Sequence, residues 1–354
     1  MNVVKQALRR PFFIKLFNWE YWSFGMVYTW IYPVWFFLCL RARSFFFFSA
    51  SNPSIVNGGF LGESKKQIHD IMPKALYPPT MHFDKGSAPE KVLKALNENG
   101  FRFPLIGKPD NGGRGRGVKV LNSDDDVFLY VKQALVDFHI QKFIELPNEV
   151  GIFYYRYPGE DKGRISGIVR KEFLTVKGDG LSSMRKLLEK DTRFLLQMEV
   201  LERIYGSRLD EVPEQGEKKL LVPYGNHARG AKFLDESHLA DEALTAVMNE
   251  ICLQVKDFYF GRLDIRYGSW EDLRNGKNFS VIEVNGAGSE PTHMYDPRHT
   301  LFFAWKEIMR HWVILWKISR MNHRRGYRYL SVKEGLRMFR EDKENSRLLE
   351  GMAE

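Results

Sequence analysis

The spacing of polar side chains between residues 262 and 285 constrains the fold of this 354-residue chain more than any other feature. Arg262-Leu263-Asp264 is followed, nineteen and twenty-one residues after its aspartate, by Glu283 and Asn285 in an apolar segment. Because side chains alternate along a strand, Arg262 and Asp264 share one face, and so do Glu283 and Asn285. Two adjacent strands could therefore present all four side chains in one cleft. The alternative is a strand pair with an ordinary surface salt bridge.

The residue types in this cluster indicate a cation site. Asp264, Glu283 and Asn285 offer hard oxygen ligands, which suit Mg²⁺ held against phosphates.

A glycine-rich loop lies upstream of this cluster. A short apolar strand ends at Lys108-Pro109, and a second strand follows at Val118–Leu121. The loop between them contains Gly112, Gly113, Arg114, Gly115, Arg116 and Gly117. Glycines let backbone N–H groups approach phosphate oxygens, and Lys108 would add a point charge. The order differs from that of a P-loop, which disfavours a Walker-type NTPase, and a glycine hairpin without a ligand is the alternative.

Over roughly residues 65–300 these motifs resemble the ATP-grasp superfamily. The resemblance implies that Lys108 and the glycine loop hold the phosphates of ATP and that Asp264, Glu283 and Asn285 bind two Mg²⁺ ions, with Mn²⁺ as an alternative metal. Asp264 would hold one ion, Glu283 would bridge the two, and Asn285 would hold the second. It implies that Arg262 steadies the transferring phosphoryl group. Further implied positions are a hinge for adenine at Gln141, Lys142, Phe143 and Ile144, a ribose ligand at Glu149, and an earlier lysine chosen from Lys65, Lys66 and Lys74.

The middle of the chain is similar to cyanophycin synthetase and related amide-forming ligases, and D-alanine:D-alanine ligases share the lysine and metal motifs. This likeness implies that Lys171 reaches the γ-phosphate or an acyl phosphate, with Arg170 as the alternative because the strand register is open. It also places the loop around Asn226 beside the reacting groups. His227 and His293 are candidate acid–base groups, although a lone histidine is more often structural.

The segment after Asn285 is where such ligases usually hold the acceptor substrate. Glu290 and His293 could bind an amine or a polar head group, as could Ser289 and Asp296, and Arg266 would suit a substrate carboxylate. An ordinary turn-rich connection built by glycine and proline is the other interpretation.

The resemblance implies an α+β fold of ATP-grasp type, with two lobes around a nucleotide cleft, and a chain of 354 residues is long enough for such a fold. The expected organisation is an aromatic, basic segment over 1–62, a catalytic domain over 63–300 and a helical, basic extension over 301–354.

Apolar spacing predicts helices over 89–98, 124–137, 181–189, 236–257 and 301–316, with Asp235 or Ser237 as the N-cap of the fourth. The final fourteen residues are acidic and are expected to be loosely ordered. The two cysteines, Cys39 and Cys252, indicate no disulfide framework.

Positive charge is concentrated at the two ends of the chain. Residues 1–62 carry six Lys or Arg against one acid, and residues 306–340 carry ten against two, so the rest is net negative although the total is +9. Of the 50 aromatic residues, 17 lie between Phe12 and Phe48. Aromatic rings flanked by arginine and lysine favour a membrane interface, and the 17-residue run from Phe24 to Leu40 is short for a span. Burial of these aromatics in the core or in a dimer interface is the alternative.

Together these patterns predict an ATP-dependent carboxylate–amine ligase, cytoplasmic and peripheral on the inner face of a membrane. Its partners would be a carboxylate and an amine of unknown identity and an anionic lipid surface, with no nucleic acid, and a homodimer is left open. A non-catalytic nucleotide-binding membrane protein and a kinase acting on a lipid or sugar are the alternatives.

Overall fold

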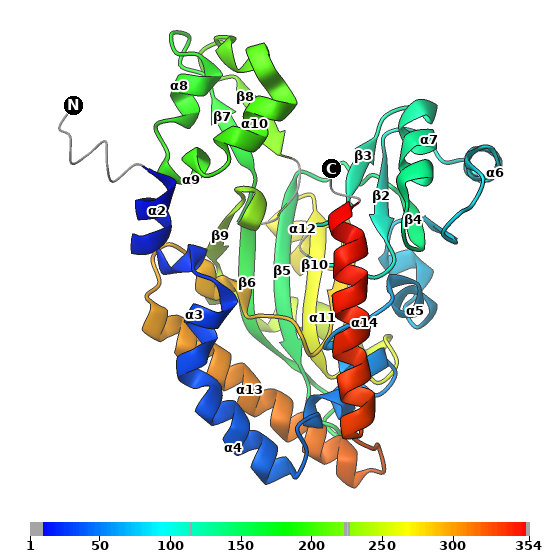
Figure 1. Cartoon of the computed structure of the whole chain (residues 1–354). Helices are drawn as coiled ribbons and strands as arrows, with labels where there is room; N and C mark the ends of the chain where they lie inside the picture. The colour runs from blue at the N-terminus through cyan, green and yellow to red at the C-terminus, as the bar shows by residue number, and fades with distance from the viewer. Residues whose placement is uncertain (1–9, 114, 223–224, 226, 352–354) are drawn as a thin grey trace. The chain divides into compact units, whose positions relative to one another are not determined.

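The computed structural model describes residues 10–113, 115–222, 225 and 227–351, which form two units. The first unit combines residues up to 32 with 169–235 and 292–307, and the second combines 33–168, 236–291 and the chain from 308 onwards. Figure 1 labels the helices and strands in chain order. Both units mix helices with antiparallel strands, which confirms the predicted α+β class.

The first unit is built around a two-stranded sheet and a separate strand pair. β7 (Leu174–Lys177) pairs with β8 (Lys218–Val222), and β9 (Lys232–Asp235) pairs with the end of β6 (Arg164–Glu172). Short helices bury apolar side chains such as Leu188 and Leu201 against β7. The helices and 3-10 turns of this unit are α2 (Pro11–Phe17), η1 (Trp19–Tyr21), α3 (Phe24–Tyr28), η2 (Thr29–Ile31), α8 (Met184–Leu188), α9 (Thr192–Leu195), α10 (Met198–Tyr205), η6 (Gly206–Asp210), η7 (His227–Arg229) and η9 (Thr292–Tyr295).

A four-stranded antiparallel sheet forms one layer of the second unit. Its order is β1 (Thr80–Phe83), β4 (Phe138–Lys142), β2 (Leu105–Pro109) and β3 (Lys119–Leu121). The helices α6 (Pro89–Glu98) and α7 (Asp124–Gln133) pack on it through Val92, Leu96, Val127 and Val131, which are almost fully buried. Further short elements of this unit are η3 (Phe47–Ala50), η4 (Val56–Gly59), α5 (Lys65–Asp70) and η5 (Lys74–Leu76).

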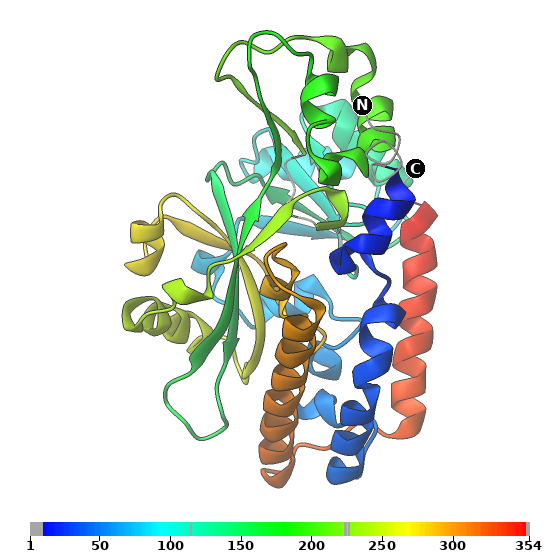
Figure 2. The ribbon, with the colours of Figure 1, turned by 90° about the vertical axis from the view of Figure 1, so that its left-hand side faces the viewer.

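The second unit also holds a larger sheet in the order β11 (Phe279–Asn285), β10 (Phe260–Tyr267), β5 (Asn148–Tyr155) and β6. One face is covered by α11 (Glu242–Leu253), with α12 (Trp270–Arg274) nearby, and the opposite face by α4 (Tyr32–Ala42) and the second half of α13 (Leu301–Arg324). Figure 2 shows the sheet nearly edge-on, with α11 on one side and α13 on the other.

The predicted helices differ from the observed ones mainly at their ends. The helix at 89–98 matches α6, whereas α7 ends at Gln133 because the next residues turn into β4. The segment 181–189 is helical only over Met184–Leu188. The segment 236–257 contains η8 (Ser237–Leu239) and then α11, whose N-cap is Asp241, so the predicted caps were wrong. The Ser237 hydroxyl instead accepts the backbone N–H of Ile168 at 3.1 Å.

The C-terminal prediction needs a larger correction. α13 runs to Arg324, two turns beyond the predicted end, and the acidic tail is not loosely ordered within the described residues. It forms α14 (Val332–Gly351), whose Leu349 is buried against the four-stranded sheet. A nonpolar contact at the far end of the helix thus orders a segment whose composition is polar.

The N-terminal aromatics divide between two environments. Phe47 and Phe48 are buried in the core beneath α4 and α13, and the Phe48 ring stacks on Phe60 with centroids 3.9 Å apart. By contrast, Trp30 and Phe37 are 74% and 56% exposed. Burial in the core is therefore confirmed for one part of the segment, and the membrane interface stays a prediction for the exposed part.

Phe48→Ala tests this division. Removing a fully buried aromatic ring is expected to lower the free energy of unfolding by about 3–5 kcal/mol. Phe37→Ala, the matched control on an exposed ring, is expected to change it by no more than about 0.5 kcal/mol. Urea unfolding followed by circular dichroism measures both, and equal effects would show that the exposed ring is part of the core.

Candidate functional site

Pairing of β10 with β11 builds the polar cluster predicted from the spacing. In the antiparallel register Arg262 lies opposite Asn285, and Asp264 lies opposite Glu283. The intervening residue Leu263 points to the other face, where it is fully buried under α11. The structure thus brings the four side chains together on one face, while their roles remain predictions.

Arg262 and Asp264 form a buried, two-pronged ion pair. The Arg262 Nε and Nη2 atoms donate to the two carboxylate oxygens of Asp264 at 2.9 and 3.2 Å. Burial alone would lower the pKa of Arg262, but the carboxylates of Asp264 and Glu283 outweigh it and raise that pKa. The arginine therefore stays charged and carries positive charge next to the carboxylates.

Glu63 is a member of the cluster that the sequence motifs did not indicate. Its Oε2 atom accepts the backbone N–H of Gly286 at 3.3 Å, directly after β11. Burial and the neighbouring Glu283 raise the pKa of Glu63 to about 8. Three carboxyl groups thus crowd around one arginine, an arrangement that a divalent cation would relieve.

Glycines hold the segment that carries Glu63 against the end of β11. The backbone N–H groups of Ala287 and Gly288 donate to the carbonyls of Gly58 and Gly59 at 3.0 and 2.8 Å. A Cβ atom on Gly286 would lie only 2.7 Å from the Gly58 carbonyl oxygen. The loop after Asn285 is therefore a close backbone contact and not only a turn-rich connection.

Lys108 and Lys65 supply positive charge beside this cluster. Lys108 is buried on β2, and its Nζ atom donates to Gln141 Oε1 at 3.0 Å and to the Ile282 carbonyl at 3.4 Å. Burial lowers the pKa of Lys108 to about 7, with Lys65 adding to the shift and Glu283 opposing it. An anionic ligand would restore the full charge of Lys108, because it would compensate the lost hydration.

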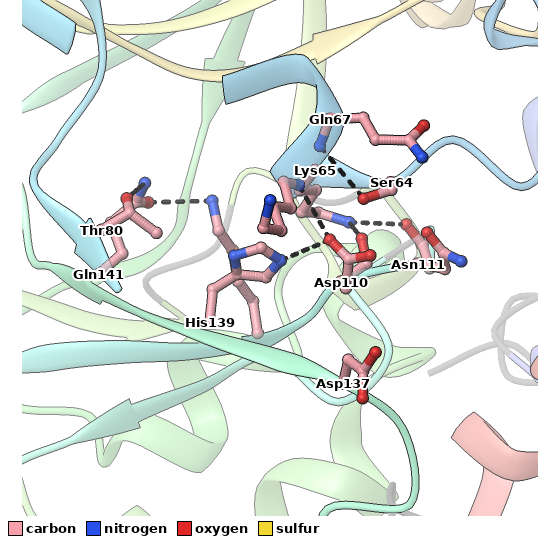
Figure 3. Close-up of polar contacts among 12 residues, drawn as sticks. Ser64, Lys65, Gln67, Thr80, Asp110, Asn111, Asp137, His139 and Gln141 are labelled. Atoms are coloured by element: carbon pink, nitrogen blue, oxygen red, sulfur yellow. Dashed lines mark hydrogen bonds and ion pairs between the residues drawn. The ribbon is translucent and has the colours of Figure 1, made fainter. Parts of the chain in front are cut away.

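The structure also separates the three candidates for the early lysine. The Lys65 Nζ atom donates to the backbone carbonyls of Asp110 and Gly112, each at 3.2 Å, at the start of the glycine loop. Figure 3 shows Lys65 next to Asp110. Lys66 is exposed and pairs with Asp70, and Lys74 is exposed in η5. Of the three, Lys65 lies with Lys108 in the pocket.

One pocket of the second unit gathers these groups. It is lined by Glu63, Lys65, Ile68, His69, Met72, Lys108, Gly112, Val281, Ile282, Glu283 and Val284. Both lysines and the β11 carboxylate thus face the same space as the glycine loop.

Within the glycine loop, Gly112 and Gly113 are exposed, and Gly115 and Gly117 have φ near +70°. Arg114 lies outside the described residues.

The loop contacts α14, which the sequence did not predict: Asn345 donates to the Asn111 carbonyl at 3.2 Å, and Arg116 pairs with Glu350 at 3.4 Å. The C-terminal helix therefore adjoins the loop expected to cover phosphates.

The predicted hinge begins in the last two residues of β4, Gln141 and Lys142, and continues beyond the strand. The backbone N–H of Lys142 donates to the Pro79 carbonyl at 3.0 Å, so it is already engaged, while Phe143 and Ile144 continue without strand pairing.

Glu149 is buried on β5 opposite Arg266, and the two side chains form an ion pair at 3.2 Å. The predicted ribose ligand and the predicted ligand of a substrate carboxylate are therefore neighbours. In the same unit, the Glu290 carbonyl accepts Arg262 Nη1 at 3.5 Å.

The remaining predicted residues belong to the first unit. Lys171 is buried on β6 opposite Phe233, whereas Arg170 is half-exposed and pairs with Glu172. His293 is buried with its Nε2 atom 3.1 Å from Glu307, and His227 lies 3.0 Å from Glu20. Asn226 lies outside the described residues. Both histidines have carboxylate partners, which supports a structural role at least as well as a catalytic one.

Comparisons with known proteins give distant likenesses. No protein-family model matches the sequence, and no curated protein is similar to it. A bifunctional glutathione synthetase from Pasteurella multocida is 15% identical, with a TM-score of 0.38 over 72% of this chain and 38% of that chain. The VanG D-Ala:D-Ser ligase from Enterococcus faecalis is 14% identical, with a TM-score of 0.41 over 72% of this chain and 61% of that chain. The D-alanine–D-alanine ligase from Bacillus anthracis is 16% identical, with a TM-score of 0.40 over 74% of this chain and 67% of that chain.

The chain thus spans less than two thirds of the length of the first two of these proteins. All three are ligases or synthetases, the class of enzyme that the sequence motifs resemble. At these TM-scores the structural likeness is too weak to assign a function, so the function is inferred from the residues of this chain.

Proposed function

We propose that the protein is an ATP-dependent carboxylate–amine ligase that forms an amide through an acyl phosphate. One observation carries the proposal: the Arg262–Asp264 pair, Glu283 and Asn285 meet across β10 and β11, and Glu283 shares a pocket with Lys65 and Lys108. Binding of a nucleoside triphosphate with Mg²⁺ requires oxygen ligands for the cation and positively charged groups for the phosphates, and this cluster offers both.

The donor set fits magnesium. Asp264, Glu283 and Asn285 supply only oxygen ligands. Glu63 is a neighbouring carboxyl group whose pKa is raised above its ordinary value. The Asn285 Nδ2 atom is buried without a hydrogen-bond partner among the described residues, so the amide nitrogen does not fix the orientation of this side chain. When bound, Mg²⁺ supplies charge neutralisation at the β- and γ-phosphates.

The residues of this chain would position and neutralise the reacting groups. A substrate carboxylate oxygen attacks the γ-phosphorus, the bond to the β–γ bridging oxygen breaks, and ADP leaves. Lys108 and Lys65 hold phosphate oxygens, and Arg262 faces the charge that develops during transfer. The amine then attacks the acyl carbon, the carbon–oxygen bond to phosphate breaks, and the amine loses a proton to water or to a nearby base.

The first test measures ADP release by the purified protein with Mg²⁺ and ATP, while amino acids, small peptides and lipid extracts are supplied as substrates. Glu283→Gln is expected to lower turnover at least about 100-fold, since it removes charge at the metal position. Glu98→Gln, on an exposed carboxylate of α6, is the matched control and should leave turnover unchanged.

Hydroxylamine distinguishes the ligase from a kinase. It traps an acyl phosphate as a hydroxamate, whereas a phosphorylated lipid or sugar is a stable ester. ATP binding without turnover on any extract would contradict both, and would favour a nucleotide-binding protein without catalysis.

Glu63 provides a pH test of the cation site. Its pKa is about 4.5 in the unfolded chain and about 8 in the folded protein, so folding favours the protonated form. The contribution of Glu63 to stability is therefore present below pH 4.5 and is lost as the pH rises to 8. Without Mg²⁺, Glu63→Gln should become more stable than the wild type as pH rises through this window, measured by thermal unfolding.

Added Mg²⁺ should reverse this order near pH 8, because a cation favours the ionised carboxylate. A Glu63→Gln variant that shows the same pH dependence as the wild type, with and without Mg²⁺, would remove Glu63 from the site.

We further propose that the protein lies on the cytoplasmic face of a membrane. One helical run, Phe24–Ala42, is long and apolar enough to cross a bilayer, and 28% of it is buried. Its exposed rings include Trp30 and Phe37, and Arg41 and Arg43 follow. Aromatic rings with adjacent arginines are typical of a segment that lies in the interface of an anionic leaflet.

Sedimentation with vesicles tests the membrane proposal. The protein should bind phosphatidylserine-containing vesicles more strongly than neutral ones, and the double variant Trp30→Ser with Phe37→Ser should bind more weakly. Leu181→Ser, on an exposed apolar side chain elsewhere, is the matched control. Resistance to alkaline carbonate extraction would instead show a segment that spans the bilayer, and no vesicle binding would contradict both.

A further inference from the structure

Three histidines of the second unit converge beside the proposed nucleotide pocket. His69 lies on α5, His82 on β1 and His139 on β4, and the pairing of β1 with β4 places His82 directly opposite His139. One ring nitrogen from each lies within 4.8 Å of those of the other two. The His82 and His139 ring centroids are 4.1 Å apart.

The ring nitrogens of this cluster are buried but not all used. The Nδ1 atom of each of the three rings is buried without a hydrogen-bond partner among the residues that the structure describes. His69 and His139 are 8% and 1% exposed, so water does not readily replace the missing partners. A buried polar atom without a partner is rare in folded proteins and indicates a ligand or a strained site.

Asp110 prepares one of these rings for a cation. Its Oδ1 atom lies 2.7 Å from His139 Nε2, which Figure 3 shows as a direct contact between the two side chains. A carboxylate in this position makes Nε2 the protonated nitrogen and leaves the lone pair on Nδ1. The same carboxylate–histidine arrangement orients histidine ligands in metal sites.

The rings are also neutral at physiological pH. Burial lowers the pKa of His69 to about 3 and that of His82 to about 4, with further lowering by His139 in each case. Burial also lowers the pKa of His139, against the opposing effect of Asp110. Neutral imidazoles keep the lone pair that a metal ion requires.

We propose that His69, His82 and His139 bind a divalent transition metal such as Zn²⁺, at a site distinct from the carboxylates of β10 and β11. Three imidazole ligands suit zinc, copper or nickel, whereas Mg²⁺ takes oxygen ligands. Ligand nitrogens around zinc lie roughly 3.3 Å apart at ordinary bond lengths, so small rotations of the rings would close the set. The fourth position is left for water or another ligand.

The charges around the cluster act in both directions. Lys65 and Lys108 disfavour a cation, as their lowering effect on the pKa of His69 shows, while Asp110 favours it. The metal would join α5 to β1 and β4. Because α5 begins at Lys65 and His139 lies opposite Lys108 in the sheet, it would stabilise the two lysines of the pocket in their places.

The test uses the untagged full-length protein after chelator treatment. Co²⁺ serves as a spectroscopic probe, because nitrogen ligands in tetrahedral geometry give intense visible bands, and Zn²⁺ is then added as a competitor. One Co²⁺ per chain, displaced by Zn²⁺, is expected. Asp110→Asn should weaken binding about 10–100-fold, and His82→Ala or His139→Ala should weaken it further.

Two controls separate this site from others. His238→Ala removes an exposed histidine next to Glu236 and should leave Co²⁺ binding unchanged. Glu283→Gln should also leave it unchanged although it abolishes Mg²⁺-dependent turnover, so failure of this inference and failure of the proposed ligase function are distinguishable. Absence of tetrahedral bands in the wild type at micromolar Co²⁺ overturns the inference, as does loss of the bands in Glu283→Gln with retention in His82→Ala. The wild-type result does not depend on the folding of any variant.

Discussion

The antiparallel register of β10 and β11 is the constraint on which the site depends. Leu263 and Ile265 of β10 are buried under α11, while Arg262 and Asp264 face the other way and meet Asn285 and Glu283 of β11. A slip of one residue would move the charged side chains into the apolar layer and expose Leu263 and Ile265. The burial that stabilises the sheet therefore also selects the face on which the polar cluster forms.

Low hydration gives the groups of the pocket their properties. The pKa of Lys108 is lowered and that of Glu63 is raised, mainly because burial removes the hydration of each group and the nearby opposite charges do not offset this loss. In a bound nucleoside triphosphate with its divalent cation, the phosphates would stabilise the charged form of Lys108 and the cation that of Glu63. Without a ligand, the charged forms of these two buried groups are only partly compensated. Binding of groups of opposite charge would stabilise them.

The aromatic rings of the N-terminal segment divide between buried and exposed positions. Phe47 and Phe48 lie in the same core as α13, whereas Trp30 and Phe37 remain exposed. Burial of the first pair ties the segment to the second unit by its own core contacts. The proposed contact with a lipid surface rests on the exposed rings, which are not part of this core.

Local patterns in the sequence determined much of the site. Alternation along short strands predicted the juxtaposition of Asp264 with Glu283, and glycine spacing located the loop after Lys108, because both signals lie within a few residues of chain. Tertiary structure alone decided which early lysine enters the pocket, added Glu63, and placed α14 against the glycine loop. It also brought together His69, His82 and His139, which lie on three separate elements. Such contacts leave no periodic signal in the sequence, because they arise from the packing of distant segments and not from the conformation of any one of them.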